Sequence, residues 1–274
     1  MEVATYRLTA NQEVTICPLG DIQWAGDPDD LAYAHLLDHI ARCAKSPHPL
    51  YIGMGDYIDF ASPSNRERLA HARLYDTAKK VIADASRHLV DDLVHQILKP
   101  TVGHWLGLTQ GHHHHPVVIG KHADGSDKIV DSDLYLAGLL KTKFLDEFAC
   151  IKLQWPGGRD FGIVAFHGKG SSVFPWGPLN QLWRLVPNFS ADLFLMGHQT
   201  KIAMGGTSRL SIDGKTHRVI RIVGTGGWTK GYVVGRRTYI SEGGLSPVAL
   251  GQPMIHIRPR IFGGRWEPNW TVEG

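Results

Sequence analysis

Five apolar segments of the chain each end in a residue that can bind a metal, next to a glycine. In chain order these groups are Gly20-Asp21-Ile22-Gln23, Gly55-Asp56, Gly111-His112-His113, His167-Gly168 and Gly197-His198. Glycine permits a sharp turn and a close backbone approach at the end of a strand. Aspartate and histidine without cysteine form a nitrogen and oxygen donor set that suits manganese, iron or zinc and disfavours a thiolate zinc site. The pattern predicts that distant loops converge on a polynuclear metal site.

Strands must place these residues close together, and the sequence before each residue predicts such strands. Residues 14–20 form a short apolar run with β-branched side chains that leads to Asp21, and residues 50–55 form a second run that leads to Asp56. Between them, residues 29–44 carry apolar positions at helical spacing. Strand, helix and strand in this order predict a βαβ unit with parallel strands, whose carboxyl ends carry the chemistry of open α/β sheets. Both aspartates fall at such ends.

The rest of the chain predicts further helices and strands. Helices are expected at residues 62–100, 133–148 and 179–186, and strands at residues 151–155, 161–166, 191–197, 218–223 and 254–261. The long first helical stretch indicates a helical insertion at about residues 61–100. We expect a single domain over residues 1–274 that contains this insertion.

The amino-acid composition limits the classes of protein to which the chain can belong. The chain has 274 residues, of which 43% are hydrophobic and 20% charged, as in a folded, soluble, globular protein. A net charge of +3 is too small to indicate nucleic-acid binding by itself. Three widely spaced cysteines without a CxxC pair argue against a disulfide framework and favour a cytoplasmic location. No export signal or membrane span is apparent, so we expect no membrane partner.

The order of the five groups resembles the calcineurin-like metallophosphoesterases, whose blocks run D-x-H, G-D-x-x-D, G-N-H-D/E, a lone H, and G-H-x-H. The resemblance spans residues 14 to about 205, and the matching segments are residues 21–23, 55–59, 111–114, 167 and 197–200. The D-x-Q form of the first block is similar to the manganese-dependent ADP-ribose/CDP-alcohol diphosphatases. Residues 224–232 are similar to a segment of phage-type members. The resemblance implies an α/β fold, a four-layer αββα sandwich of two mixed sheets.

The resemblance also implies a site that holds two divalent metal ions. The implied ligands are Asp21, Gln23, Asp56, His112, His167 and His198, with Thr200 as a weak further ligand. Asp56 would bridge the two ions. Gln23 and His112 replace a histidine and an asparagine of the family pattern and can still ligate, whereas Thr200 replaces a histidine with a poor ligand. We therefore expect Mn²⁺, with Zn²⁺, Fe²⁺ or Ni²⁺ as alternatives, and a weaker second site.

Four further residues are candidates for roles beside the metal ions, and the resemblance implies the role of the first, His113. His113 would face the leaving group and protonate it, and Asp59 would orient a neighbouring group by a hydrogen bond. Lys169 and His114 would contact the substrate. Taken singly, an aspartate after a strand is more often a helix cap, and a loop lysine such as Lys169 is usually only solvated. The ordered set as a whole is what favours a site.

The predicted function is hydrolysis of a phosphoester by a hydroxide that two cations activate. A phosphodiester or a nucleotide diphosphate is favoured as substrate, because Phe60 and Ala61 follow Asp59 where protein phosphatases have Arg-Gly. One alternative is a phosphomonoesterase. Another, motivated by Gln23 and Thr200, is a catalytically weakened metal-binding protein with a structural or nucleic-acid-associated role. The sequence does not decide the oligomeric state.

Overall fold

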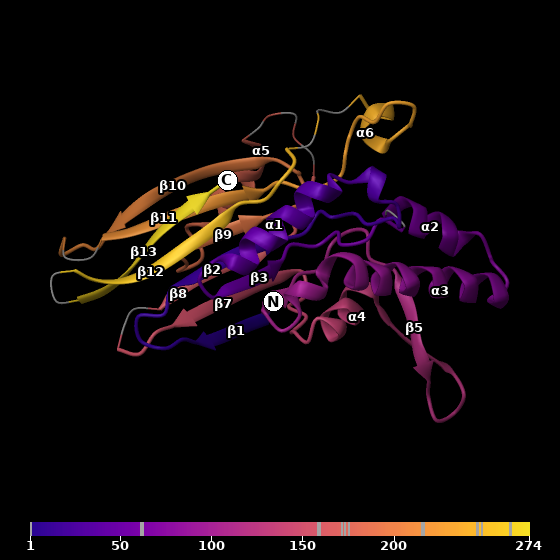
Figure 1. Ribbon diagram of the computed structural model, residues 1–274, viewed down its shortest axis with the longest axis horizontal. Helices are drawn as coiled ribbons and strands as arrows, with labels where there is room; N and C mark the ends of the chain where they lie inside the picture. Colours follow the sequence, from indigo (N-terminus) through magenta and orange to yellow (C-terminus); the bar gives the residue numbers. More distant parts are fainter. Residues whose placement is uncertain are drawn as a thin grey trace.

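The computed structural model describes residues 2–60, 63–157, 160–170, 172, 174, 176–214, 217–244, 247, 249–262 and 265–274. The strands, shown in Figure 1, are β1 (Glu2–Arg7), β2 (Val14–Leu19), β3 (Pro49–Gly53), β4 (Trp105–Leu108), β5 (Pro116–Lys121), β6 (Asp127–Asp131), β7 (Phe148–Gln154), β8 (Phe161–Phe166), β9 (Leu193–Met196), β10 (Ile202–Leu210), β11 (His217–Thr225), β12 (Met254–Phe262) and β13 (Arg265–Glu273). The helices are α1 (Tyr33–Lys45), α2 (Pro63–His71), α3 (Asp76–Leu93), α4 (Ser132–Leu139), α5 (Gly177–Leu185) and α6 (Tyr239–Glu242), with the short turns η1 (Pro28–Asp30), η2 (Val94–Leu98) and η3 (Lys99–Thr101).

Two mixed sheets form the centre of the molecule. The six-stranded sheet has the order β1-β7-β8-β9-β11-β10, and the five-stranded sheet has the order β13-β12-β2-β3-β4. In the second sheet β2, β3 and β4 are parallel, as the predicted βαβ unit requires. In the first sheet β8, β9 and β11 are parallel. Strands β5 and β6 form a separate hairpin.

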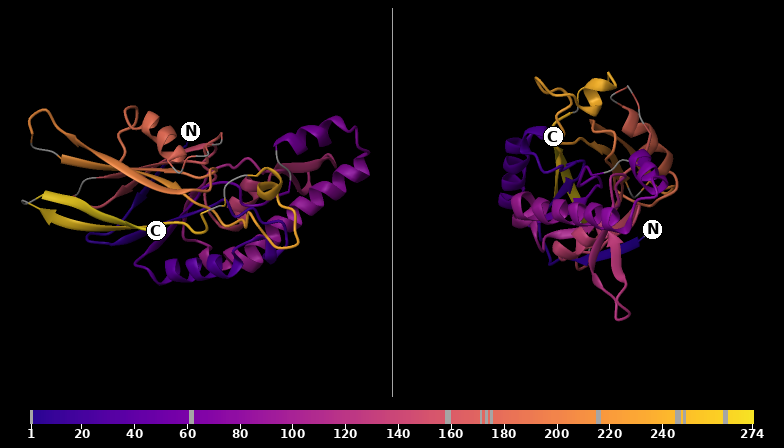
Figure 2. Two further views of the ribbon diagram at one scale, coloured as in Figure 1. Left: turned by 90° about the horizontal axis from the view of Figure 1, so that it is seen from above. Right: turned by 90° about the vertical axis from the view of Figure 1, so that its right-hand side faces the viewer.

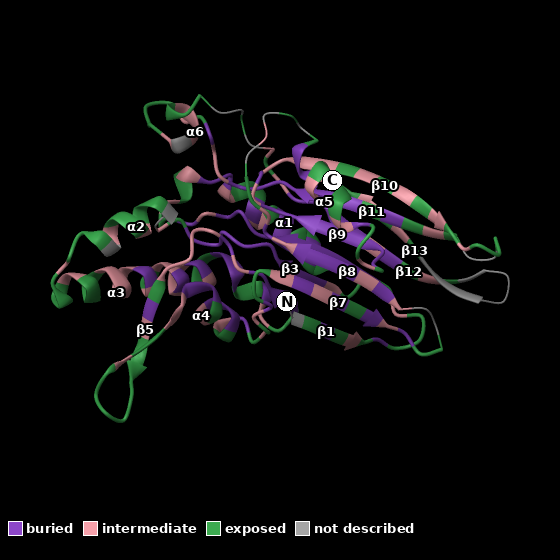
Figure 3. Cartoon of the chain, turned by 180° about the vertical axis from the view of Figure 1, so that it is seen from behind, coloured by how far each residue is buried: buried purple, intermediate pink, exposed green. Residues whose placement is uncertain are grey.

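Three apolar clusters show how the layers pack. The first lies between the sheets and joins side chains of both, such as Ile52 and Ile151. The second joins the five-stranded sheet to α1, α3 and α4, and the third joins the six-stranded sheet to α5 through Leu182. Figure 3 shows the central strands buried and the outer helices exposed on their far sides. The layers are therefore helix, sheet, sheet and helix, which confirms the predicted fold class.

Helices also occupy the segment predicted as an insertion, although residues 61 and 62 lie outside the described part of the chain. Figure 2 shows α2 and the start of α3 extending past the sheets. The end of α3 and the turn that follows it pack into the core through Val90, Leu93 and Ile97. This segment therefore contributes to the helical layer over the five-stranded sheet. The single domain over residues 1–274 stays a prediction.

The structure corrects the helix predicted at residues 133–148. Helix α4 ends at Leu139, because Lys141 takes a left-handed backbone conformation with φ of 56°, and β7 already begins at Phe148. The predicted strands do not include β1, β4, β5, β6, β10 and β13. In the described part of the chain, no helix combines the length and apolar character that crossing a bilayer requires.

Candidate metal centre

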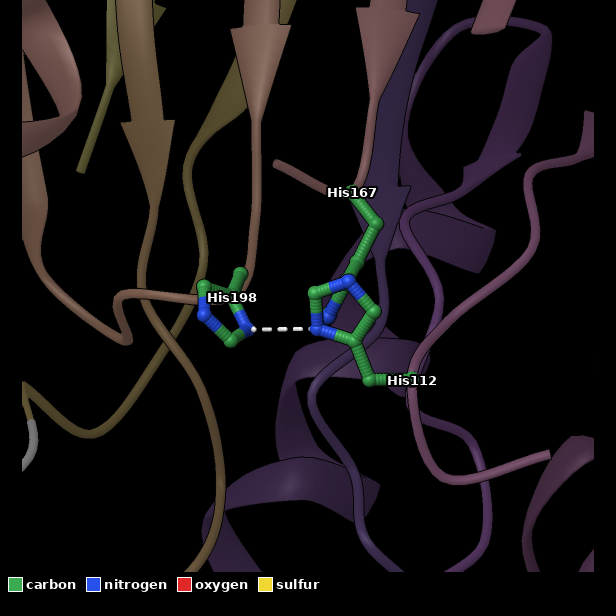
Figure 4. Close-up of side chains that lie close together, drawn as sticks. All are labelled: His112, His167 and His198. Carbon is green, nitrogen blue, oxygen red and sulfur yellow. Dashed lines mark hydrogen bonds between the residues drawn. The ribbon is translucent and has the colours of Figure 1, made fainter. Parts of the chain in front are cut away.

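The predicted ligands follow the carboxyl ends of five strands. Asp21 follows β2, Asp56 follows β3 and His112 follows β4, all parallel strands of one sheet. His167 directly follows β8 and His198 follows β9, which are parallel neighbours in the other sheet. Parallel strands deliver their carboxyl ends to one edge of a sheet. The two sheets therefore bring five loops together, and Figure 4 shows His112, His167 and His198 meeting from three of them.

Glycines let these loops approach closely. A Cβ atom on Gly55 would lie 2.7 Å from His167 Nδ1, and one on Gly197 would lie 2.6 Å from Asp21 Oδ2. A Cβ atom on Gly111 would overlap the backbone nitrogen of Asp56. Real side chains do not tolerate such distances, so glycine is required at these positions for the site to assemble.

Several of the predicted residues have a strained backbone. Asp21, Gln23, Asp56, His198 and Thr200 have φ values of 46°, 53°, 50°, 62° and 47°, respectively. The left-handed region costs a residue other than glycine roughly 1–2 kcal/mol. Strain of this kind persists where the surrounding structure imposes it, and it is concentrated at functional sites.

Two groups of side chains have donor atoms close enough to hold an ion. One group is Asp21, Asp56 and His167, and the other is His112, His167 and His198; within each group all donor atoms lie within 4.8 Å of one another. His167 belongs to both groups. Its Nδ1 atom lies 2.7 Å from the carbonyl oxygen of Met54, which can only accept a hydrogen bond. Nδ1 therefore carries the hydrogen, and Nε2 is left to face the site.

Within the described part of the chain, two buried atoms of the ligand groups lack a hydrogen-bond partner. They are Asp21 Oδ1 and His167 Nε2. Nε2 lies 3.0 Å from Asp56 Oδ2 but is not aligned for a hydrogen bond. A buried carboxylate oxygen and an imidazole lone pair repel each other unless a proton or a cation lies between them. The donor set of carboxylates and imidazoles thus fits a divalent transition metal.

Burial and neighbouring charges separate the acidities of the ligands. Burial raises the pKa of Asp21 to about 7, and Asp56 adds to this effect. Burial acts in the same direction on Asp56, but the charges of His167 and His113 outweigh it and hold the pKa of Asp56 below its usual range. For His167, burial opposes charging, yet Asp56 and Asp21 raise its pKa to about 9. Without a metal, a proton takes the place of the cation at this position.

His112 and His198 stay neutral at pH 7. Burial, with help from the charge of His167, lowers the pKa of His198 to about 4 and also lowers that of His112. Their Nδ1 atoms lie 3.3 Å apart. Two nitrogens that bind one zinc-sized ion at about 2.0–2.1 Å each are separated by a similar distance. In the metal-free protein one of these Nδ1 atoms donates its hydrogen to the other, and a shared ion bound between them would take the place of that hydrogen.

His113 and Asp59 form a pair beside these ligands. His113 Nδ1 lies 2.8 Å from Asp59 Oδ1, and its Nε2 atom lies 3.9 Å from Asp56 Oδ2. Burial would lower the pKa of His113, but the hydrogen bond that His113 donates to Asp59 and the charge of Asp56 raise it. The raised pKa favours the charged imidazole, in which Nε2 carries a hydrogen towards Asp56, as a general acid requires.

The structure gives local contacts for three of the remaining predicted residues. Gln23 Oε1 accepts a hydrogen bond of 2.8 Å from Thr229, and the carbonyl oxygen of Thr200 accepts one of 3.1 Å from the backbone of Ala249. His114 Nδ1 lies 2.5 Å from Asp131 Oδ2. The side chain of Lys169 is exposed. The two ligand groups consist of histidine and aspartate side chains and do not include His114, and the roles of Gln23 and Thr200 as ligands stay predictions.

Two residues that sequence reasoning missed hold the loop at residues 111–114. The buried carboxylate of Asp133 accepts a hydrogen bond of 2.9 Å from the backbone of Gly111. Arg66 on α2 donates to the carbonyl oxygens of His112 and His114. Asp133 lies at the start of one predicted helix and Arg66 lies within another. From the sequence alone, each residue was therefore explained by its place in a helix. Only the fold brings them to this loop.

Comparisons with known proteins add little to this picture. No protein-family model matches the sequence, and no curated protein gives a significant match. The structure is similar to Vacuolar Protein Sorting 29 from Cryptosporidium parvum, with a TM-score of 0.38 and 11% identity over 96% of this chain and 98% of that one. It is also similar to Vps29 from Entamoeba histolytica complexed with zinc, with a TM-score of 0.35 and 11% identity over 95% and 98% of the two chains. Similarity at this level carries no argument about function.

Proposed function

We propose that this chain is a calcineurin-like metallophosphoesterase that hydrolyses a phosphodiester or a nucleotide diphosphate. The observation that carries the proposal is the position of the His113–Asp59 pair beside two ligand groups that share His167. A metal site alone has many uses. A metal site with a protonated imidazole next to it has the parts that hydrolysis of a phosphoester needs.

The proposed ligands are Asp21, Gln23, Asp56, His112, His167 and His198. When bound, two divalent cations would lower the pKa of the attacking water and neutralise charge on the phosphoryl oxygens. Mn²⁺ is our first choice, with Zn²⁺, Fe²⁺ and Ni²⁺ as alternatives, because the donors are imidazole nitrogens and oxygens only. The D-x-Q block at residues 21–23 supports a likeness to the ADP-ribose/CDP-alcohol diphosphatases, and the segment at residues 224–232 supports a likeness to phage-type members.

His113 supplies the proton in the proposed reaction. As the bond between phosphorus and the leaving oxygen breaks, Nε2 of His113 gives its proton to that oxygen. Asp59 holds the ring through Nδ1 at 2.8 Å and favours its charged form. Lys169 and His114 remain proposed substrate contacts, and Arg66 adds a positive charge close to the same loop. The protein would act in the cytoplasm.

Metal analysis together with an activity screen tests the proposal. The purified protein is assayed on bis-p-nitrophenyl phosphate and on p-nitrophenyl phosphate with added Mn²⁺, Zn²⁺, Fe²⁺ or Ni²⁺. We expect metal-dependent hydrolysis of the diester, and its loss in Asp56→Asn. Faster hydrolysis of the monoester would identify a phosphomonoesterase. Absence of hydrolysis of both esters with every metal would refute the proposal.

A second candidate is a metal-binding protein with weakened catalysis. It is favoured by Thr200, which offers no imidazole, and by Gln23, whose oxygen already accepts a hydrogen bond from Thr229. One tightly held metal and no turnover would support this candidate. Under the main proposal, Thr200→His raises the affinity for a second cation. Unchanged metal content in Thr200→His would show that residue 200 does not face the site.

A further inference from the structure

Phe174 and Trp176, the aromatic pair, lie stacked and exposed in the segment between β8 and α5. Their rings are parallel to within 10°, and the ring centres are 5.1 Å apart. The two residues are 55% and 54% exposed, respectively. Single exposed apolar residues are common, whereas adjacent large rings on a surface are typical of sites that bind another molecule. The rings are too close to admit a further ring between them, so a third flat ring can stack only on an outer face of the pair.

Backbone contacts hold the aromatic pair in place. The carbonyl oxygen of Trp176 accepts a hydrogen bond of 3.0 Å from the backbone of Leu179 in the first turn of α5. The carbonyl oxygen of Phe174 accepts one of 3.0 Å from the backbone of Gly177 and one of 3.1 Å from Lys201 Nζ. The pair is therefore positioned before any ligand arrives, which lowers the entropic cost of binding.

The segment that carries the aromatic pair borders the candidate metal centre. It begins directly after the proposed ligand His167, and the backbone of Gly170 forms a hydrogen bond with the side chain of His198. A Cβ atom on Gly177 would lie 2.5 Å from Oε1 of Gln199, the residue after His198. Contacts with the loop after β9 thus flank the aromatic pair on both sides. The pair therefore lies beside the metal centre, on the side that the six-stranded sheet provides.

The charge of this part of the chain favours a ligand that contains phosphate. Between residues 161 and 212 the sequence has one acidic residue and four basic residues, namely Asp192 against Lys169, Arg184, Lys201 and Arg209. Asp192 is buried, and its carboxylate is paired with Arg218 at 2.7 Å. The excess of positive charge attracts anions. A flat aromatic surface in a basic surrounding is complementary to a nucleotide, which joins a flat base to a phosphate.

We propose that the aromatic pair binds the base of a nucleoside whose 5′-phosphoryl group is cleaved at the metal centre. The inference rests on the proposed function and specifies the part of the substrate that stays on phosphorus. A nucleobase stacks on an exposed aromatic ring whichever base it is, because every base has a π face. The leaving group takes its proton from His113, on the loop after β4 of the five-stranded sheet. The two ends of the substrate thus contact loops of different sheets.

Three esters that share one leaving group test the inference. They are the p-nitrophenyl esters of thymidine 5′-phosphate, methyl phosphate and cyclohexylmethyl phosphate. In each ester, water adds to phosphorus, the bond to the nitrophenyl oxygen breaks, and the released p-nitrophenol is measured by its absorbance. The cyclohexylmethyl group is apolar but not flat. We expect kcat/KM of the wild-type protein to be at least about fivefold higher for the thymidine ester than for the other two.

Variants separate stacking from other effects. Trp176→Ala should lower the ratio of kcat/KM for the thymidine ester to that for the methyl ester at least about fivefold, mainly through a higher KM for the thymidine ester, and Trp176→Phe should retain most of the ratio. The control is Trp183→Ala, which removes another exposed indole about two turns along α5 and should leave the ratio unchanged. Isothermal titration with thymidine 5′-monophosphate and with methyl phosphate repeats the comparison without turnover.

The outcomes separate the inference from the proposed function. Equal kcat/KM for all three esters, or a ratio that Trp176→Ala retains, would overturn the inference, while hydrolysis of the methyl ester would still support the proposed function. Equal kcat/KM for the cyclohexylmethyl and thymidine esters would also overturn the inference, because the site would then recognise apolar surface without regard to shape. If no ester is hydrolysed, the proposed function is rejected. The titration then decides base binding, and equal affinity for both ligands would reject that as well.

Discussion

Asp56 accepts hydrogen bonds through one oxygen from two successive backbone N–H groups, those of His112 and His113, and faces His167 with the other oxygen. Its orientation is therefore fixed by the loop after β4 before any ion arrives. This arrangement explains why one carboxylate is held charged while the nearby Asp21 has its pKa raised to about 7. At the scale of single residues, the different contacts of Asp21 and Asp56 move the pKa values of these two buried acids in opposite directions.

The His113–Asp59 pair makes a prediction about pH. The acid must be protonated to act, so activity falls as pH rises through the pKa of His113. Asp59 raises that pKa, and Asp59→Asn should therefore move the alkaline limb of the kcat/KM profile to lower pH. His113→Ala should lower kcat by about 10²–10⁴-fold and leave the metal content unchanged. Loss of metal from His113→Ala would show that His113 is a ligand instead.

The backbone conformation of Thr200 leads to a prediction about the stability of the protein. Its φ of 47° is costly for a β-branched residue, and glycine takes the same conformation without strain. Thr200→Gly should raise the free energy of unfolding by about 0.5–1 kcal/mol. This value is the strain energy that the substitution removes, reduced by the conformational entropy that a glycine loses on folding. Thr207→Gly, in extended backbone of β10, is the control and should destabilise the protein. Chemical denaturation measures both; equal effects would show that Thr200 stores no strain.

At the scale of elements, the approach of the loops at Gly111 and Asp56 is the tightest point of the site. Gly111→Ala would force these loops apart, so it should abolish metal binding while the rest of the fold remains. Gly138→Ala, in α4 with open space around it, should stabilise the protein by about 1 kcal/mol. Metal analysis and thermal denaturation of both variants check the prediction. Normal metal content in Gly111→Ala would contradict the convergence of these loops.

Local patterns predicted some elements and missed others for physical reasons. β2, β3, β8 and β9 are short apolar runs that end in glycine and a polar residue, so their sequence alone indicates where the site residues emerge. β1 pairs with β7 across the chain, and no local signal reports such pairing. Arg66 and Asp133 were missed because their contacts to the loop at residues 111–114 depend on how separate helices pack. The helix predicted at residues 133–148 extends past the end of α4, because Lys141 ends the helix and no glycine or proline marks that end in the sequence.

At the scale of the whole molecule, the stability of the metal-free protein should depend on pH. His167 has its pKa raised from 6.5 to about 9 and Asp21 from 3.8 to about 7 in the folded state. Both bind protons more tightly when folded, so their stabilisation is complete at low pH and is lost as pH rises through 7 and then 9. His198, with its pKa lowered to about 4, acts in the opposite direction only below pH 6.5.

Thermal unfolding after treatment with EDTA measures this effect. The melting temperature should fall between pH 6.5 and pH 9, and His167→Gln should flatten the slope. Because a cation must displace these protons, added Mn²⁺ should bind more tightly and raise the melting temperature more at pH 9 than at pH 6.5. A cation effect that is equal at both pH values would contradict the assignment of His167 as a ligand.

Because both donor groups contain His167, the structure has a consequence for the order in which two metal ions would bind. His167 belongs to both donor groups, and one imidazole nitrogen cannot bind two ions at once. An ion held by His167 together with His112 and His198 leaves the oxygen donors of Asp21, Asp56 and Gln23 to the other ion. The two ions should therefore enter in sequence, the nitrogen-rich position first. Stoichiometry measured at low metal concentration would then stop at one ion per chain, even in a protein that works with two.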